Sequence, residues 1–215
     1  MVALTLFEAA DLVDRFYSAP DGDDVTASID EEGAQAYMLS NGILVIPGTN
    51  ELSDWFRFNF DVYDRDQDSN FVIKEHRGAS GRRYHAGFLN HARKIFDFAK
   101  PLKPKLIIGH SLGAASAQIV GWSLKCPTIA FASPRVIRGR SELKYENIVL
   151  NICRTDDLVT QVPPAILGFQ HIGQVFWMSP RGREFGEDHR IDQYVDMMKA
   201  RHVRNHLPEK WPFFA

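Results

Sequence analysis

Cysteine is scarce in this chain, and no stretch stays apolar for long. Two cysteines, Cys126 and Cys153, among 215 residues cannot supply a disulfide framework or a structural zinc cluster, and we expect no metal. Both lie beside apolar segments, where a free cysteine usually behaves as a small hydrophobic residue. No run of about 18 apolar residues occurs, so no transmembrane segment is predicted.

The chain also lacks an excess of either charge. Its 25 basic and 27 acidic residues are interspersed and leave a formal net charge of -2. A protein that holds a phosphate backbone needs a basic field, so nucleic acid is not an expected partner. The short basic stretches 135–140 and 201–204 are expected to be solvated faces rather than polyanion sites.

The features of an export signal are missing from the first residues. Met1-Val2-Ala3-Leu4 does not open a basic segment followed by a long apolar segment and a small-residue cleavage site. We therefore expect a cytoplasmic protein. Export stays an alternative, because removal of a leader would leave the same sequence.

Length, composition and the order of the predicted elements indicate one α/β domain. With 45% hydrophobic residues, a chain of this length can bury one substantial core, and no Pro/Gly/Ser-rich linker divides it, so we expect a single domain over residues 1–215. In the second half, strand-like and helical segments alternate, which predicts an α/β sandwich with a mostly parallel sheet. The expected helices are 6–17, 88–99 before Pro101, and 191–199; the expected hairpin is 36–46 around Asn41-Gly42; the expected buried strands are 105–108, 128–132, 148–153 and 172–178.

Gly109-His110-Ser111-Leu112-Gly113-Ala114 has the pattern of a nucleophile elbow. It follows an apolar run and precedes a small-residue helical stretch, which together give the strand, sharp turn and helix that such an elbow needs. A serine at the tip of this turn has a strained backbone, and Gly109 and Gly113 leave room for strand and helix to pass closely. The alternative, that Ser111 only caps a helix, is less favoured in this context.

A serine hydroxyl is a poor nucleophile at neutral pH, so it needs a histidine to take its proton and a carboxylate to orient that histidine. In α/β-hydrolases these partners follow in the order serine, acid, histidine. Asp156 and Asp157 directly follow a predicted strand, and both are candidates for the acid. His189 lies in a loop before a helix, from which its ring could reach Ser111. The remaining downstream histidines, expected in packing or surface roles, are His171, His202 and His206.

Several further segments of the sequence are informative together with the elbow. They are Ile46-Pro47-Gly48-Thr49, His85-Ala86-Gly87-Phe88, Phe131-Ala132-Ser133-Pro134-Arg135-Val136, the segment 157–164 that begins Asp157-Leu158-Val159, Phe169-Gln170-His171-Ile172-Gly173, and 188–194. Together they resemble the class 3 lipases, the filamentous-fungal triacylglycerol lipase family and its bacterial relatives, over most of the chain. Two departures bear on loop geometry: Pro47 replaces an arginine that many members have, and Thr160 replaces a proline.

The resemblance implies an α/β-hydrolase fold, with a central mostly parallel sheet flanked by helices and a short helical lid. It selects Asp157 as the acid and His189 as the histidine that complete a catalytic triad with Ser111. It also implies an oxyanion hole made by the backbone N–H and hydroxyl of Thr49 and the N–H of Leu112. For Leu112 the residues agree, because the N–H after an elbow nucleophile lies at a helix N-terminus. Thr49 by itself would fit a helix N-cap equally well.

The segment 52–60 holds five large apolar residues and occupies the place of the family's lid. An amphipathic lid can leave the pocket for an acyl phase while its polar face stays wet; a buried structural helix is the alternative. The residues expected to form the lid and contact substrate are Leu52, Trp55, Phe56 and Phe58.

The expected function is that of a lipase or esterase, a serine hydrolase of carboxylic esters. It would cleave acylglycerols or related acyl lipids through an acyl-enzyme on Ser111, with no cofactor and with transient contact to a lipid interface. One alternative is a phospholipase A1, galactolipase or short-chain esterase on the same triad. The other is a non-catalytic lipid-binding module on a hydrolase scaffold.

Overall fold

A computed structural model describes residues 4–18, 22, 24–48, 63–65, 71–139, 143–180, 189–204, 206–208 and 210–211.

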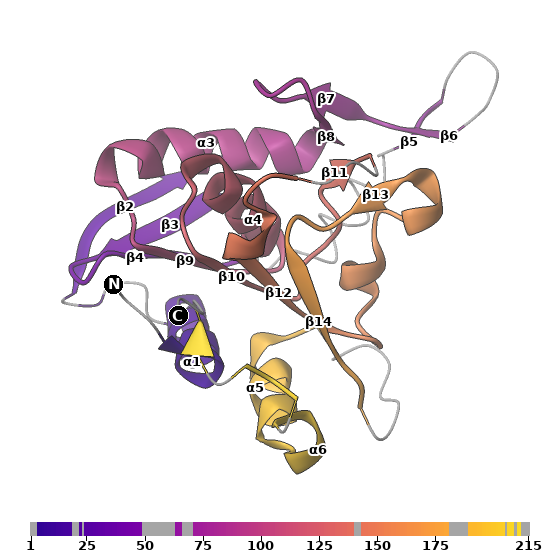
Figure 1. The fold of residues 1–215 in the computed structure, drawn as a ribbon. Coiled ribbons are helices and arrows are strands. Elements are labelled where there is room, and N and C mark those ends of the chain that lie inside the picture. Colours follow the sequence, from indigo (N-terminus) through magenta and orange to yellow (C-terminus); the bar gives the residue numbers. More distant parts are fainter. Residues whose placement is uncertain are drawn as a thin grey trace.

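A seven-stranded sheet runs through the centre of the protein (Figure 1). Its strands are β2 (Val25–Glu31), β3 (Ala34–Leu39), β4 (Ile43–Ile46), β9 (Leu106–His110), β10 (Thr128–Phe131), β12 (Val149–Arg154) and β14 (Gln174–Met178). They lie in the order β14-β12-β10-β9-β4-β3-β2. The first five are parallel, whereas β3 and β2 are antiparallel to their neighbours. The expected mostly parallel sheet is confirmed.

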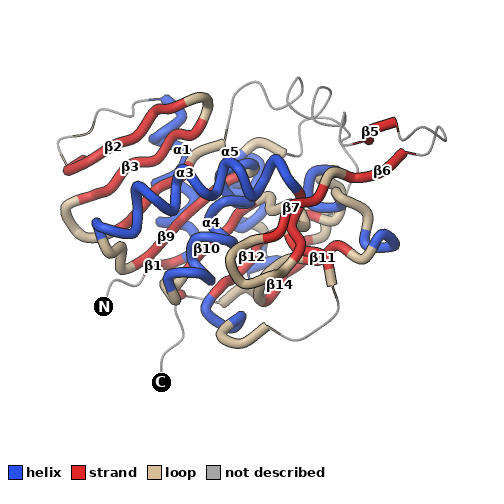
Figure 2. Tube along the Cα trace, turned by 90° about the horizontal axis from the view of Figure 1, so that it is seen from above, coloured by secondary structure: helices blue, strands red, loops and turns tan. Residues whose placement is uncertain are grey.

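Helices cover both faces of this sheet. They are α1 (Leu6–Ser18), α3 (Ala86–Leu102), α4 (Leu112–Leu124), α5 (Ile191–Lys199) and the short α6 (Arg201–Arg204). α3 and α4 pack on one face, and α1 and α5 pack together on the other (Figures 1 and 2). None of these described helices is long and apolar enough to cross a membrane.

The side chains of β9 show how one strand joins the two layers. Because successive residues of a strand point to opposite faces, Leu106 and Ile108 pack in the core beneath α1, and Ile107 packs in the core beneath α3 and α4. All three are fully buried. This is why the strand is apolar without alternation, as strands buried on both faces are.

Short strands flank the main sheet and were not predicted. An antiparallel sheet joins β13, β11, β8 and β7, and two further pairs join β5 with β6 and β1 with β15. Strands of two or three residues carry too few side chains for a recognisable alternation. Their bounds are β1 Leu4–Thr5, β5 Tyr63–Arg65, β6 Phe71–Ile73, β7 Glu75–Arg77, β8 Arg83–His85, β11 Ile137–Arg138, β13 Phe169–Gln170 and β15 Lys210–Trp211.

Two predicted elements were wrong in detail. α3 does not stop before Pro101, because this proline lies in the last turn of the helix, which closes with the Lys103 N–H donating to the Ala99 carbonyl at 3.1 Å. The strand expected over 172–178 begins at Gln174 and is an edge strand rather than a buried one. Its Trp177 is 39% exposed.

The two cysteines are free and buried, as expected. Burial raises the pKa of the Cys126 thiol to about 12 and raises that of Cys153 further. Both therefore stay neutral at physiological pH and pack as small hydrophobic residues.

Two histidines connect α3 to its surroundings. The Nδ1 of His85 accepts the Phe88 N–H at 3.4 Å and caps the helix. The Nε2–H of His91 donates to the Gly33 carbonyl at 3.2 Å, while its Nδ1 accepts the Ser116 hydroxyl at 2.6 Å. Desolvation lowers the pKa of both histidines to about 4.

Acidification from pH 6.5 to pH 4 is therefore expected to lower the free energy of unfolding. In this window the unfolded chain protonates His85 and His91, whereas the folded protein keeps both neutral. Their contribution is complete above pH 6.5 and is lost as the pH falls toward 4, by at most about 1.4 kcal/mol per pH unit for each histidine. Urea unfolding between pH 4 and 8 measures this slope. In a His85→Asn/His91→Gln variant the free energy of unfolding should depend less steeply on pH. An equally steep dependence would contradict the role given to these two histidines.

Candidate active site

Ser111 occupies a sharp turn between β9 and α4. Its backbone has φ 61° and ψ -121°, a conformation that costs a residue other than glycine about 1–3 kcal/mol. Two hydrogen bonds hold it there: the Ser111 N–H donates to the Phe131 carbonyl at 3.0 Å, and the Ala115 N–H donates to the Ser111 carbonyl at 3.0 Å. The side chain makes no capping bond to the helix, so a helix cap does not explain this serine.

Gly109 and Gly113 allow the strand and the helix to meet. A Cβ on Gly113 would lie 2.0 Å from the carbonyl oxygen of Ile46, and one on Gly109 would lie 2.5 Å from the carbonyl oxygen of Gly113. Real Cβ atoms do not approach backbone this closely, so any larger residue would force β4, β9 and α4 apart. The spacing expected of a nucleophile elbow thus has a steric cause.

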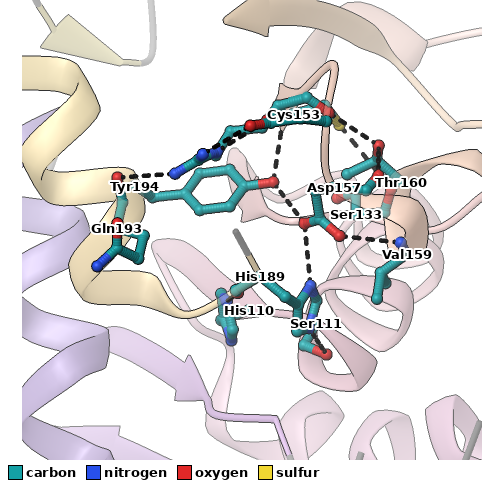
Figure 3. Close-up of polar contacts among 12 residues, drawn as sticks. His110, Ser111, Ser133, Cys153, Asp157, Val159, Thr160, His189, Gln193 and Tyr194 are labelled. Carbon is teal, nitrogen blue, oxygen red and sulfur yellow. Dashed lines mark hydrogen bonds and ion pairs between the residues drawn. The ribbon is translucent and has the colours of Figure 1, made fainter. Parts of the chain in front are cut away.

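Ser111, His189 and Asp157 form one hydrogen-bonded row (Figure 3). The Ser111 hydroxyl lies 2.7 Å from His189 Nε2, and His189 Nδ1 lies 2.9 Å from Asp157 Oδ2. In the neutral tautomer that fits both bonds, Nδ1–H donates to the carboxylate and Nε2 accepts the hydroxyl proton. Ser111 follows β9 and Asp157 follows β12, so the row lies at the carboxyl edge of the parallel strands, where α/β proteins bind ligands.

Asp157 is 2% exposed, and both of its oxygens have donors. The Tyr194 hydroxyl donates to Oδ2 at 2.8 Å, and the Val159 N–H donates to Oδ1 at 2.9 Å (Figure 3). Tyr194 is completely buried, and desolvation raises its pKa well above 10, so it stays a neutral donor. Its oxygen in turn accepts the Arg154 N–H at 3.1 Å. Buried carboxylates need such partners.

The neighbouring Asp156 has a different place. Its carboxylate forms a two-pronged ion pair with the Arg154 guanidinium at 3.0 and 2.8 Å, and both side chains are 6% exposed. Of the two aspartates between which the residue pattern alone could not choose, Asp157 is therefore the one in contact with His189.

The other downstream histidines have packing or surface contacts. His171 donates from Nε2 to the Ser133 carbonyl at 2.8 Å, and burial lowers its pKa to about 4. His202 donates from Nε2 to the Ser179 carbonyl at 3.2 Å. His206 is exposed.

A second row of hydrogen bonds lies behind the first, and sequence reasoning missed it. The Gly48 N–H donates to the Tyr17 oxygen at 2.6 Å, the Tyr17 hydroxyl donates to His110 Nδ1 at 2.6 Å, and His110 Nε2–H donates to the His189 carbonyl at 2.9 Å. Desolvation holds the pKa of the buried His110 well below 6.5, so the ring is neutral and can both accept and donate. The row connects the end of β4 with the backbone of His189.

Thr49 and the expected lid residues Leu52, Trp55, Phe56 and Phe58 lie outside the described residues. Gly48, the last described residue before them, lies against Ser111, because a Cβ on Gly48 would lie 2.9 Å from the Ser111 Cβ. Leu112 is the first residue of α4, and an N–H in the first turn of a helix has no acceptor within it.

Solved structures similar to this chain are fungal lipases. A lipase from Rhizopus microsporus var. chinensis has 16% sequence identity and a TM-score of 0.62, with 82% of this chain and 77% of that chain covered. Lipase II from Rhizopus niveus has 19% identity and a TM-score of 0.59, with 81% and 78% covered. The mono- and diacylglycerol lipase from Aspergillus oryzae has 17% identity and a TM-score of 0.59, with 85% and 82% covered.

No protein-family model matches the chain. At identities of 16–19%, the structural comparison establishes a shared fold. It confirms the α/β-hydrolase architecture that the resemblance to class 3 lipases predicted.

Replacement of Tyr194 by phenylalanine is expected to destabilise the protein by about 1–3 kcal/mol, because the buried Arg154 N–H loses its acceptor and Asp157 loses a donor. Urea unfolding at pH 7 measures the change. Tyr145→Phe is the matched control, since Tyr145 is 57% exposed and should tolerate loss of its hydroxyl. Equal stability of the two variants would contradict a structural role for the Tyr194 hydroxyl.

Proposed function

We propose that this protein is a serine hydrolase of carboxylic esters, acting on acylglycerols or related acyl lipids. The observation that carries the proposal is the row Ser111–His189–Asp157, with hydrogen bonds of 2.7 and 2.9 Å at the carboxyl edge of the sheet. A serine on a strained turn, a histidine within hydrogen-bond distance of it and a buried carboxylate are together the components that activate a hydroxyl for acyl transfer.

In the proposed reaction, the Ser111 oxygen attacks the ester carbonyl while His189 Nε2 takes the hydroxyl proton. His189 then gives this proton to the leaving alcohol, and the acyl group stays on Ser111. A water molecule then attacks the acyl carbon while His189 takes its proton; the bond from this carbon to the Ser111 oxygen breaks, His189 returns the proton to that oxygen, and the carboxylic acid leaves. Asp157 keeps the Nδ1 proton in place and stabilises the imidazolium that forms in each step.

The negative charge on the attacked carbonyl oxygen needs donors that are already in position. In this proposal the Leu112 N–H is one donor, because it lies at the N-terminus of α4 next to Ser111. Thr49 is the other, on the basis that it directly follows Gly48, which lies against Ser111. Loss of one such donor typically lowers turnover about 10²–10³-fold.

Exposed apolar side chains in the segment that follows Asp157 support a lipid substrate. Leu158 directly follows Asp157 and is 76% exposed, and Ile166, further along the chain in the short helix Ala165–Leu167, is 90% exposed. Large apolar side chains in water at the rim of a site are suited to contact with an acyl phase. The names of the similar structures, a mono- and diacylglycerol lipase among them, favour the same substrate class.

Hydrolysis of nitrophenyl esters from acetate to palmitate, with and without an emulsified interface, tests the proposal. Ser111→Ala should lower the turnover about 10⁴–10⁶-fold, and Asp157→Asn about 10⁴-fold. A preference for long chains that grows at the interface would support acyl lipids as the substrates. Full activity of Ser111→Ala would contradict the proposal.

Ser116→Ala is the matched control. Ser116 lies on α4, five residues after Ser111, and also bonds a histidine, at 2.6 Å to His91. It is fully buried and belongs to the packing between α3 and α4. This variant should retain hydrolysis within a few-fold, and circular dichroism shows whether each variant is folded.

A further inference from the structure

A cavity of about 470 Å³ lies between α3, α4 and the turn that joins β7 to β8. This volume is in the range of about 300–1,000 Å³ that ligand pockets have. On α4 the cavity is lined by Ile119 and Trp122, which follow Ser111 by eight and eleven residues, or about 12–16 Å along the helix axis. It is therefore separate from the row around Ser111.

The walls of the cavity are mainly apolar. Leu89, Ala92 and Phe96 come from α3 and face Ile119 and Trp122 of α4. In Figure 1 the two helices lie on the face of the sheet opposite α1, with β7 and β8 beside them. An alkyl chain is the kind of group that such walls remove from water most favourably.

The rim of the cavity is positively charged. Arg93, Lys125 and Lys144 line it together with one acidic residue, Asp97. Within the described part of the chain, no ion pair involves these three cations. Lys125 Nζ lies 4.8 Å from the centre of the Tyr145 ring.

The backbone beside the rim is fixed by α4. The Trp122 indole N–H donates to the Lys144 carbonyl at 2.7 Å, which holds the residue at the mouth of the cavity. The apolar walls and the cations thus come from α3, from α4 and its C-cap Lys125, and from the segment around Lys144.

We propose that this cavity is a second binding site, for the carboxylate form of a long-chain fatty acid. The alkyl chain lies between α3 and α4, and the carboxylate binds Lys125 and Lys144 at the rim. A carboxylate can form ion pairs with the exposed Lys125 and Lys144, which a neutral apolar ligand cannot, so a fatty acid matches both features of the cavity. That the protein itself would release such a fatty acid rests on the proposed function. The fit of a fatty acid to the cavity does not depend on it.

Nuclear magnetic resonance with stearate that carries a nitroxide near its methyl end locates the site directly. Saturable broadening of amide signals is expected over Leu89–Phe96 and Ile119–Lys125. Broadening restricted to the surroundings of Ser111 and His189, or none at all, would overturn the proposal. Because a fatty acid is not an ester, this result does not depend on whether the protein hydrolyses esters.

Charge reversal tests the head group. Lys125→Glu/Lys144→Glu should weaken palmitate binding roughly tenfold and leave hexadecanol binding unchanged. Lys103→Glu is the matched control: Lys103 and Lys125 are both exposed lysines that end a helix in the left-handed conformation, but Lys103 does not line the cavity. Equal palmitate affinity in the double variant and the control would overturn the proposal.

Filling the cavity tests its walls independently of charge. Ser123 is exposed and lines the cavity, so Ser123→Trp places a large ring there without disturbing the core. This variant should keep its melting temperature and lose the broadening on α3 and α4. Broadening that persists in the folded variant would contradict binding between the two helices.

Discussion

The close packing of β4, β9 and α4 is the constraint on which the site depends. Gly113 lies so near Ile46, and Gly109 so near Gly113, that neither position has room for a Cβ. This contact lets α4 start directly over the end of β9 and holds the Ser111 backbone at a positive φ of 61°. The strain costs about 1–3 kcal/mol and is offset by the cores on both sides of the sheet. Its result is a serine side chain that bonds His189 instead of capping its own helix.

Buried polar groups around the site are stabilised by one another. Asp157 is bonded by His189, Tyr194 and the Val159 N–H, which compensates the cost of removing a carboxylate from water. Thr160, where class 3 lipases have a proline, is also buried, and its hydroxyl lies 2.7 Å from the Asp157 carbonyl. Thr160 therefore adds a local bond in the loop that carries Asp157. Networks of this kind rigidify a site when every member has a partner.

The sequence was informative where a local pattern has one structural meaning. The elbow required glycines at two fixed positions, and the apolar runs before and after it could only be buried. The choice of Asp157 over Asp156 needed either the family resemblance or the structure. Asp156 forms an ion pair with Arg154, and no local sequence pattern predicts this pair. Tyr17 and Tyr194 could not be found in this way: each lies on an amphipathic helix at a position typical of core packing, and Tyr17 meets His110 across 93 residues. For Tyr194, the one available signal was that it ends the segment 188–194, which belongs to the resemblance to class 3 lipases.

Covalent labelling with a fluorophosphonate ester, followed by intact mass measurement and peptide mapping, tests the central claim most directly. The probe reacts with a serine only when a base activates it beside oxyanion donors. The account predicts a single adduct, on Ser111, whose formation slows strongly in Asp157→Asn and is unaffected in Ser116→Ala. No adduct, or an adduct on a different serine, would contradict it.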